Sequence, residues 1–166
     1  MFMIRQATPN DIELLHRLGN IAFAHTYREI LSPEQMAYML DWMYSCESLR
    51  QQMADGHTYF IIYQEETPCG YLSISTEPDG DTFHLQKIYI LPEFQGSHLG
   101  FRLFRKAIEH IKELHPSPCR MLLNVNRHNT KALAFYQRMG MSKVDEGDFP
   151  IGQGYYMNDY IMGLDI

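Results

Sequence analysis

The spacing of hydrophobic residues in the first third of the chain predicts helices. Between residues 8 and 54, apolar side chains recur every three to four positions, which is typical of helices that pack along one face. Thr8 and Ser32 each precede a proline, and each has a residue three positions later that can complete an N-terminal cap. The predicted elements are a strand at residues 3–7 and helices from Thr8 to about Ala24, from Ser32 to Ser45 and from 47 to 54.

From residue 58 onward the pattern changes to alternate positions, which is typical of strands. Short polar turns at 65–68 and 77–81 divide this region into consecutive antiparallel strands. The second half then mixes the two periods, with an amphipathic helix closed by His115 and Pro116 and a later helix that ends at Gly140. The predicted strands are 58–64, 69–76, 82–90, 120–125, 141–147 and 155–166, and the predicted helices are Leu99–Leu114 and Asn129–Met139.

This order of elements predicts a mixed α+β fold in which most of the sheet is antiparallel. A chain of 166 residues, of which 45% are hydrophobic, can bury a full core as one domain spanning residues 1–166. The opening residues hold no charged-then-apolar leader, and no apolar run approaches the ~18 residues of a membrane span. We therefore expect a cytoplasmic protein that interacts with no membrane. Three cysteines without CxxC spacing favour reduced thiols over disulfides or a zinc site.

The net charge of −6 hides an asymmetry along the chain. Residues 87–143 hold ten basic and three acidic side chains, a charge of +7, whereas the remainder carries −13. A nucleic-acid-binding protein normally presents a dominant basic face, so this distribution argues against a nucleic-acid partner. It suits a protein that holds an anion in one place and attracts a cation to another.

The stretch PEFQGSHLG places two glycines, Gly96 and Gly100, between a predicted strand and a predicted helix. A helix N-terminus preceded by glycines exposes unpaired N–H groups and the positive end of the helix dipole, so it can bind phosphate without a lysine. The stretch matches neither a P-loop nor GxGxxG. Taken alone, an ordinary strand-to-helix turn would explain it equally well.

One strand later, NRHNTKALAFYQRMGM opens a second helix. The two stretches together resemble the GNAT superfamily of acetyl-CoA-dependent N-acetyltransferases, over practically the whole chain. The loop motif Gln/Arg-x-x-Gly-x-Gly/Ala is matched from Gln95 to Gly100, and the helix motif Asn-x-x-Ala-x-x-x-Tyr-x-x-x-Gly-Phe is matched in part by Asn129, Ala132, Tyr136 and Gly140. The resemblance implies a twisted sheet of about seven strands with helices on both faces. The segments TYREILSPEQMAYMLDWMYS and YYMNDYIM look most like bacterial spermidine/spermine acetyltransferases, a much less specific match.

Two positions depart from the family motifs. His98 stands where the family usually has its central glycine, and Met141 replaces the phenylalanine after Gly140, a conservative change in packing. The side chain of His98 can either point away from the pyrophosphate or add a hydrogen-bond donor to it. We expect it to point to solvent.

By similarity, the main chain of Ile88, Tyr89 and Ile90 pairs with the pantetheine arm as an added strand, and the loop holds the pyrophosphate. Arg102 would meet the adenosine phosphates, although a solvated helix face explains it equally well. The residues expected to contact acetyl-CoA are Ile88, Tyr89, Ile90, Gln95, Gly96, Ser97, His98, Leu99, Gly100, Phe101, Arg102, Asn124, Asn129 and Tyr136.

The resemblance places Tyr136 beside the departing thiolate, to which a phenol can give a proton or a hydrogen bond. Some relatives have a basic glutamate on the fifth strand, where this chain has Asn124, which can only orient a water. Others have a glutamate early in the fourth strand, where His84 stands; strand alternation would put it on the face of Gln86, Ile88 and Ile90. His84 can accept a proton directly or through water. A surface histidine, or a water chain without any base, explains the sequence equally well.

The remaining candidates concern the acceptor. Methionines and aromatic residues between 36 and 44 can form either a core face or a pliable ligand surface, and the core face is favoured. The acceptor surface of this superfamily gathers after the first helix, where the candidates are His25, Tyr27 and Glu29, together with Tyr155 and Tyr156 near the C-terminus. His110 and His115 are five apart and no HExxH occurs, so no metal is expected.

The resulting hypothesis is acetyl transfer from acetyl-CoA to a small cationic primary amine, such as a polyamine, by direct attack in a ternary complex. The charge of −13 outside the basic segment motivates the cationic acceptor. Two alternatives stay open: an acetyltransferase acting on protein or peptide N-termini, and a catalytically silent acyl-CoA sensor. A homodimer is also possible, because dimers are common among such enzymes.

Overall fold

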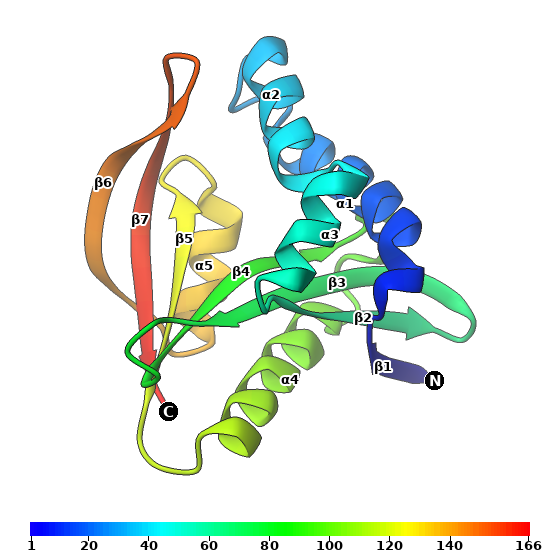
Figure 1. Ribbon diagram of the computed structural model, residues 1–166, viewed down its shortest axis with the longest axis vertical. Helices are drawn as coiled ribbons and strands as arrows, with labels where there is room; N and C mark the ends of the chain where they lie inside the picture. Colours follow the sequence, from blue (N-terminus) through cyan, green and yellow to red (C-terminus); the bar gives the residue numbers. More distant parts are fainter.

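The computed structural model describes all residues from 1 to 166, and one seven-stranded sheet runs through its centre (Figure 1). The strands lie side by side in the order β1-β2-β3-β4-β5-β7-β6. Every neighbouring pair is antiparallel except β4 and β5, which are parallel and joined through a helix. The predicted fold class is therefore confirmed. The strands are β1 (Phe2–Gln6), β2 (Thr58–Gln64), β3 (Thr67–Thr76), β4 (Thr82–Ile90), β5 (Arg120–Asn126), β6 (Ser142–Gly152) and β7 (Tyr155–Asp165).

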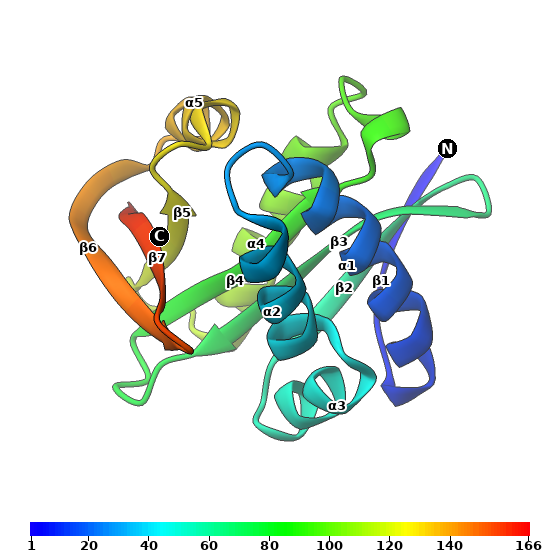
Figure 2. The ribbon, with the colours of Figure 1, turned by 90° about the horizontal axis from the view of Figure 1, so that it is seen from above.

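Helices cover both faces of the sheet, as Figure 2 shows from above. One face carries α1 (Ile12–Tyr27), α2 (Pro33–Tyr44) and α3 (Cys46–Ala54), and the other carries α4 (Leu99–Leu114) and α5 (Thr130–Arg138). Each face has its own hydrophobic core. None of the helices combines the length and hydrophobicity needed to cross a membrane.

Local capping signals fix where the helices begin. Thr8 forms the predicted capping box with Asp11, although a 3₁₀ turn at Pro9–Asp11 precedes α1, and Ser32 accepts a hydrogen bond from the N–H of Gln35. Helix α1 ends at Tyr27 rather than near Ala24, because no breaker stops it and the ring of Tyr27 packs 4.5 Å from that of Phe23. This extra turn carries Tyr27 into the candidate site.

A β-bulge in the middle of β4 changes which face each side chain occupies. Ser73 of β3 pairs with Lys87 but the next residue, Ile74, pairs with Leu85, so Gln86 is an extra residue in β4. Leu85 and Ile88 therefore both pack on the α4 side, and Lys87 lies against the helices α2 and α3. The expectation that His84 shares a face with Ile88 and Ile90 is wrong, because the bulge inverts the alternation.

The bulge also separates β4 from β5. The parallel pairing of these strands covers only Thr82 to His84 on β4, and beyond it β5 turns away, as Figure 1 shows. A bulged strand bends and twists more strongly than a regular one. The result is a gap in the middle of the sheet, bounded by the C-terminal half of β4 on one side.

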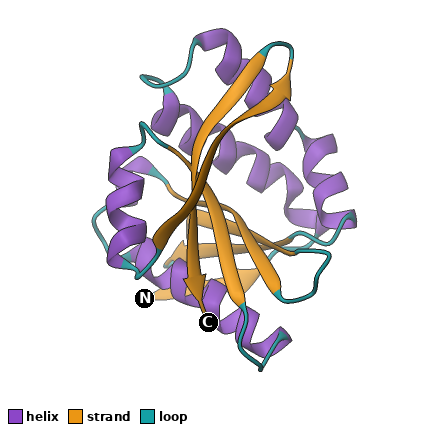
Figure 3. Cartoon of the chain, turned by 90° about the vertical axis from the view of Figure 1, so that its left-hand side faces the viewer, coloured by secondary structure: helices purple, strands orange, loops and turns teal.

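Strands β6 and β7 form a long hairpin that rises from the sheet toward α2 (Figure 3). The amide of Gln35 donates to the carbonyl of Tyr156 at 2.9 Å, and the hydroxyl of Tyr38 donates to the carbonyl of Ile151. The hairpin is longer than predicted, since β6 continues to Gly152. These contacts join residues more than a hundred positions apart and close one side of a pocket.

Candidate active site

A cavity of about 700 Å³ occupies the gap between β4 and β5. We call it the inter-strand groove. Its walls come from the second half of β4, the loop before α4, β5 and helix α5. Ser97 and Arg102 do not line it, and the guanidinium of Arg102 lies over the ring of Phe2 instead. The predicted cofactor-binding residues that the structure does bring together along the groove are Ile88, Tyr89, Ile90, Gln95, Gly96, His98, Leu99, Gly100, Phe101, Asn124, Asn129 and Tyr136.

The main chain of β4 offers hydrogen-bonding groups to the groove. The N–H of Leu91 donates to the carbonyl of Cys69 and so points toward β3. Along a strand, the main-chain N–H and C=O groups of successive residues point alternately to one neighbouring strand and to the other. The main-chain groups of Ile88 and Ile90 consequently point the other way, into the groove. The side chain of Gln95 donates to the carbonyl of Ile90 at 3.1 Å and accepts a hydrogen bond from Lys131 at 2.8 Å. An extended ligand could pair with this strand edge.

The N-terminus of α4 opens at one end of the groove. His98 precedes it with φ of 61° and ψ of 17°, the left-handed conformation that a glycine adopts most easily, and its side chain is exposed. A Cβ on Gly96, whose φ is 88°, would meet nothing within 4 Å, so the main chain there is open to a ligand. The first N–H groups of this 16-residue helix have no partner within the helix and lie at the positive end of its dipole.

Tyr136 lines the inter-strand groove from α5 and is 8% exposed. Burial raises the pKa of its phenol well above the usual range, and the neighbouring Tyr27 adds to the shift. The hydroxyl therefore keeps its proton at neutral pH and can donate it. Asn129 caps the same helix, since its side-chain oxygen accepts from the N–H of Ala132, which positions the first turn of α5 beside the groove.

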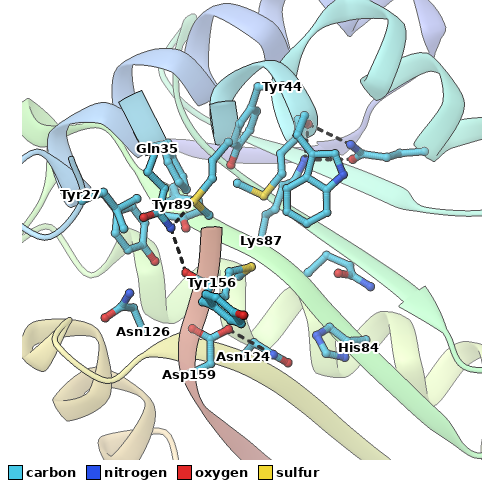
Figure 4. Close-up of a pocket in the computed structure, with 18 of the residues that line it drawn as sticks. Tyr27, Gln35, Tyr44, His84, Lys87, Tyr89, Asn124, Asn126, Tyr156 and Asp159 are labelled. Carbon is cyan, nitrogen blue, oxygen red and sulfur yellow. Dashed lines mark hydrogen bonds between the residues drawn. The ribbon is translucent and has the colours of Figure 1, made fainter. Parts of the chain in front are cut away.

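A second cavity, of about 450 Å³, lies on the opposite side of β4, beneath α2 and the β6–β7 hairpin (Figure 4). We call it the aromatic pocket. Five residues line both cavities, which therefore meet at one point of the molecule. The shared residues are Tyr27, Gln86, Lys87, Tyr89 and Asn124.

The aromatic pocket contains only part of the predicted acceptor surface. Tyr27 and Tyr156 line it, but His25, Glu29 and Tyr155 do not. His84 also lies in this pocket, with its Nδ1 at 3.5 Å from a carboxylate oxygen of Glu77, and burial lowers the pKa of its imidazole. Of the methionines and aromatic residues of α2, Met39 and Tyr44 are buried in the core, and they line the pocket together with Trp42 and Met43. Their use as a ligand surface stays a prediction.

Two charged residues of the aromatic pocket were missed in the sequence. Asp159 on β7 is 1% exposed, and its carboxylate accepts one hydrogen bond, from the amide of Asn124 at 3.3 Å. Burial raises the pKa of this carboxyl. Lys87 donates to the carbonyl of Met43, the side chain of Gln52 and the hydroxyl of Tyr59, while burial lowers its pKa to about 7. The only local feature of the sequence that marks Asp159 or Lys87 is that each is a charged residue within a largely apolar strand.

Comparisons with known proteins agree with this geometry. The family model described as the acetyltransferase (GNAT) family matches residues 21–141. An uncharacterized N-acetyltransferase of Lactobacillus delbrueckii subsp. lactis is 28% identical over 156 residues, which covers 90% of this chain and 89% of that protein.

Solved structures share the fold. The PaiA N-acetyltransferase of Thermoplasma acidophilum, crystallised with coenzyme A, has a TM-score of 0.82 at 21% identity and covers 100% of this chain and 99% of its own. Mutant forms of the spermidine/spermine N-acetyltransferase SpeG of Vibrio cholerae give a TM-score of 0.69 at 18% identity, with coverage of 99% and 93%. Since the family match spans most of the sequence, the chain belongs to the acetyltransferase (GNAT) family and is an acetyl-CoA-dependent N-acetyltransferase.

Proposed function

We propose that acetyl-CoA occupies the inter-strand groove, that a primary amine enters through the aromatic pocket, and that the amine attacks the thioester directly in a ternary complex. The observation that carries this proposal is the meeting of the two cavities at Tyr27, Tyr89 and Asn124. Two substrates that arrive from opposite sides of β4 can react there without a covalent enzyme intermediate. Acetyl-CoA supplies the activated acetyl group.

The groove suits a long, flexible ligand that ends in a diphosphate. Its strand edge presents the main-chain groups of Ile88 and Ile90, which match the amides of a pantetheine arm. At the other end, the N-terminus of α4 and the open main chain at Gly96 can receive phosphate oxygens. Gln95 donates to Ile90 in this structure and would release that carbonyl when the arm binds. The predicted contacts of Ser97 and Arg102 have no support from the groove lining.

Tyr136 is the proposed proton donor to the departing sulfur. Its phenol is buried, protonated at neutral pH and lies in the same groove as Ile88. The main-chain N–H of Ile88 or Ile90 would polarise the carbonyl under attack, which is stabilisation of the oxyanion-hole type.

The amine must lose a proton before it attacks, because an alkylammonium has a pKa near ~10. His84 lies in the aromatic pocket and can take this proton through water, since its lowered pKa keeps the imidazole neutral at physiological pH. Asn124 lines both cavities and can orient such a water. The alternative is a water chain that carries the proton away without any base.

A polyamine acceptor, and membership of the spermidine/spermine branch, stay predictions. SpeG shares the fold, but the aromatic pocket holds one carboxylate where a polyamine carries several ammonium groups. Acetylation of peptide N-termini is the second candidate. The predictions of a homodimer, of a cytoplasmic location and of a reaction without metal stay predictions.

An acetyl-CoA consumption screen tests the proposal. The acceptors should include polyamines, aminoglycosides, amino acids and short peptides, with Tyr136→Phe as the matched variant. We expect turnover with at least one class of primary amine, and loss of that turnover in the variant. Tight coenzyme A binding without turnover on any amine would favour the silent sensor, and no binding of coenzyme A or acetyl-CoA by calorimetry would refute the assignment of the groove.

A further inference from the structure

The aromatic pocket is poor in charge compared with the chain that surrounds it. Although the protein carries 20 acidic residues, only one carboxylate, that of Asp159, is among the 19 residues that line this pocket. The greater part of the remaining wall is aromatic, aliphatic or thioether. These side chains are Phe23, Tyr27, Leu31, Met39, Trp42, Met43, Tyr44, Tyr89, Tyr156 and Met157.

Asp159 is buried without a cationic partner. Its neighbour Arg127 pairs with Asp148 and donates to the carbonyl of Gly147, outside the pocket. The only hydrogen bond to the carboxylate comes from the neutral amide of Asn124 at 3.3 Å. A buried carboxylate with so little compensation is costly to the folded protein, and a ligand cation would satisfy it.

The rest of the pocket lining holds no second acidic side chain: besides Lys87 it contains His57 and His84, and burial lowers the pKa of both imidazoles. Lys87 lies with Tyr44, across from Asp159, as Figure 4 shows. Its three donors are already taken by Met43, Gln52 and Tyr59, so it has none left for a ligand carboxylate. When protonated, it repels a second ammonium group in the same pocket.

We propose that the aromatic pocket selects an amine that carries a single positive charge on an apolar or aromatic body. Asp159 holds the ammonium, and the body packs against Trp42 and Met43 on α2. Asn124, whose amide donates to Asp159 at 3.3 Å, lines both cavities, as Tyr27 does. The nitrogen bound at Asp159 is thus beside the point where the two cavities meet.

This inference rests on the proposed function for the use of the pocket, and it excludes two acceptor classes on physical grounds. A di- or polyamine would leave its second ammonium in an apolar wall or beside Lys87. A free amino acid would leave its carboxylate without a cationic partner. An arylalkylamine, or a peptide whose N-terminal residue has an apolar side chain, avoids both costs.

The pocket contains its own reporter, because Trp42 is the only tryptophan of the chain. We would titrate the coenzyme A complex with 2-phenylethylamine, with putrescine and with the uncharged 2-phenylethanol, and follow the fluorescence of Trp42. Calorimetry repeats each titration independently of the tryptophan signal. The variants are Asp159→Asn, which keeps the shape of the side chain, and Asp165→Asn, which removes an exposed charge of the same strand outside both cavities.

We expect 2-phenylethylamine to bind at least about tenfold more tightly than putrescine, and Asp159→Asn to remove at least about tenfold of that affinity. Asp165→Asn should bind the amine like the parent, and the binding of 2-phenylethanol should be the same in all three proteins. Equal or tighter binding of putrescine, no binding of 2-phenylethylamine, or unchanged affinity in Asp159→Asn would overturn the inference.

Acetyl transfer is measured separately on the same proteins. Amine binding that depends on Asp159, without acetyl transfer to any amine, would leave the inference standing and refute the proposed function. Acetyl transfer to putrescine with unchanged kinetics in Asp159→Asn would refute the inference and leave the proposed function standing. Thermal unfolding of both variants shows that a loss of binding does not come from loss of the fold.

Discussion

The ammonium nitrogen of Lys87 lies 4.2 Å from the centre of the Tyr44 ring, and this contact joins the sheet to the helices above it. The same nitrogen donates to the carbonyl of Met43 at the end of α2 and to Gln52 on α3. A lysine directly after the bulge of β4 therefore fixes the position of the two helices that form the wall of the aromatic pocket.

Stability should depend on pH through Lys87. Burial lowers its pKa to about 7 from an ordinary 10.5, so the unfolded chain holds a proton that the folded chain releases above about pH 7. The unfolded state then binds more protons, and the free energy of unfolding rises with pH, by up to ~1.4 kcal/mol per pH unit between about 7 and 10. Urea unfolding across this range measures the slope.

Replacement of Lys87 by Met should abolish that slope without loss of the fold. Gln52 also donates to Met43 and accepts from Tyr59, so no acceptor of Lys87 is left without a partner. Lys112→Met, at an exposed position of α4, is the control and should keep the slope. The same pH dependence in Lys87→Met and in the parent would show that this lysine is not its source.

Asp159→Asn should make the protein more stable near neutral pH. Burial raises the pKa of the Asp159 carboxyl, so the folded chain holds its proton to higher pH than the unfolded chain does, and stability is lost as pH rises from about 4 through the raised pKa. The neutral amide carries no such cost, and we expect a gain of about 1–2 kcal/mol. Thermal unfolding at about pH 7 checks this, and an unchanged or lower midpoint relative to Asp165→Asn would contradict it.

Tyr136→Phe should lower kcat by about 100-fold while the affinity for coenzyme A stays within about twofold, because the ring still packs and only the proton donor is lost. Steady-state kinetics and calorimetry separate the two effects. Tyr155→Phe, which changes a ring that packs against Tyr38 outside both cavities, should leave kcat unaltered. A similar loss in both variants would argue against a specific role for Tyr136.

His98→Gly should stabilise the protein by up to about 1 kcal/mol, because glycine adopts the left-handed conformation without strain. His98→Ala keeps the strained main chain and removes the ring, so it should show no such gain. Calorimetry with coenzyme A shows which way the imidazole of His98 points when the ligand is bound. If both variants bind coenzyme A as tightly as the parent protein, the side chain points to solvent. Weaker binding in both would mean that His98 donates to the phosphates.

The sequence was sufficient for the elements whose signals are local. The caps at Thr8 and Ser32, the two-residue period of the strands and the terminating Gly140 act within a few positions of the residues they organise. The loop and helix motifs placed the inter-strand groove for the same reason, since each is a short stretch with a fixed spacing. Arg102 was misplaced because one turn of helix carries it away from the groove, over Phe2.

The aromatic pocket could not be predicted because its parts are distant in sequence. Asp159 meets Asn124 across 35 positions, and Lys87 meets Met43 across 44. The bulge at Gln86 has no glycine or proline to mark it, so regular alternation gave the wrong face for His84. Which helix covers which strand is settled by packing of the whole chain, and only the structure reveals that α2 faces the β6–β7 hairpin.

The extra residue in β4 gives one strand two separate tasks. Before Gln86, β4 pairs with both β3 and β5. After Gln86 it no longer pairs with β5, and it separates the two cavities. Without Gln86, β4 and β5 would pair over more of their length, and their main chains would close the inter-strand groove. Such a deletion would leave a folded protein without its groove, so the capacity to hold two reactants at once depends on one bulge in β4.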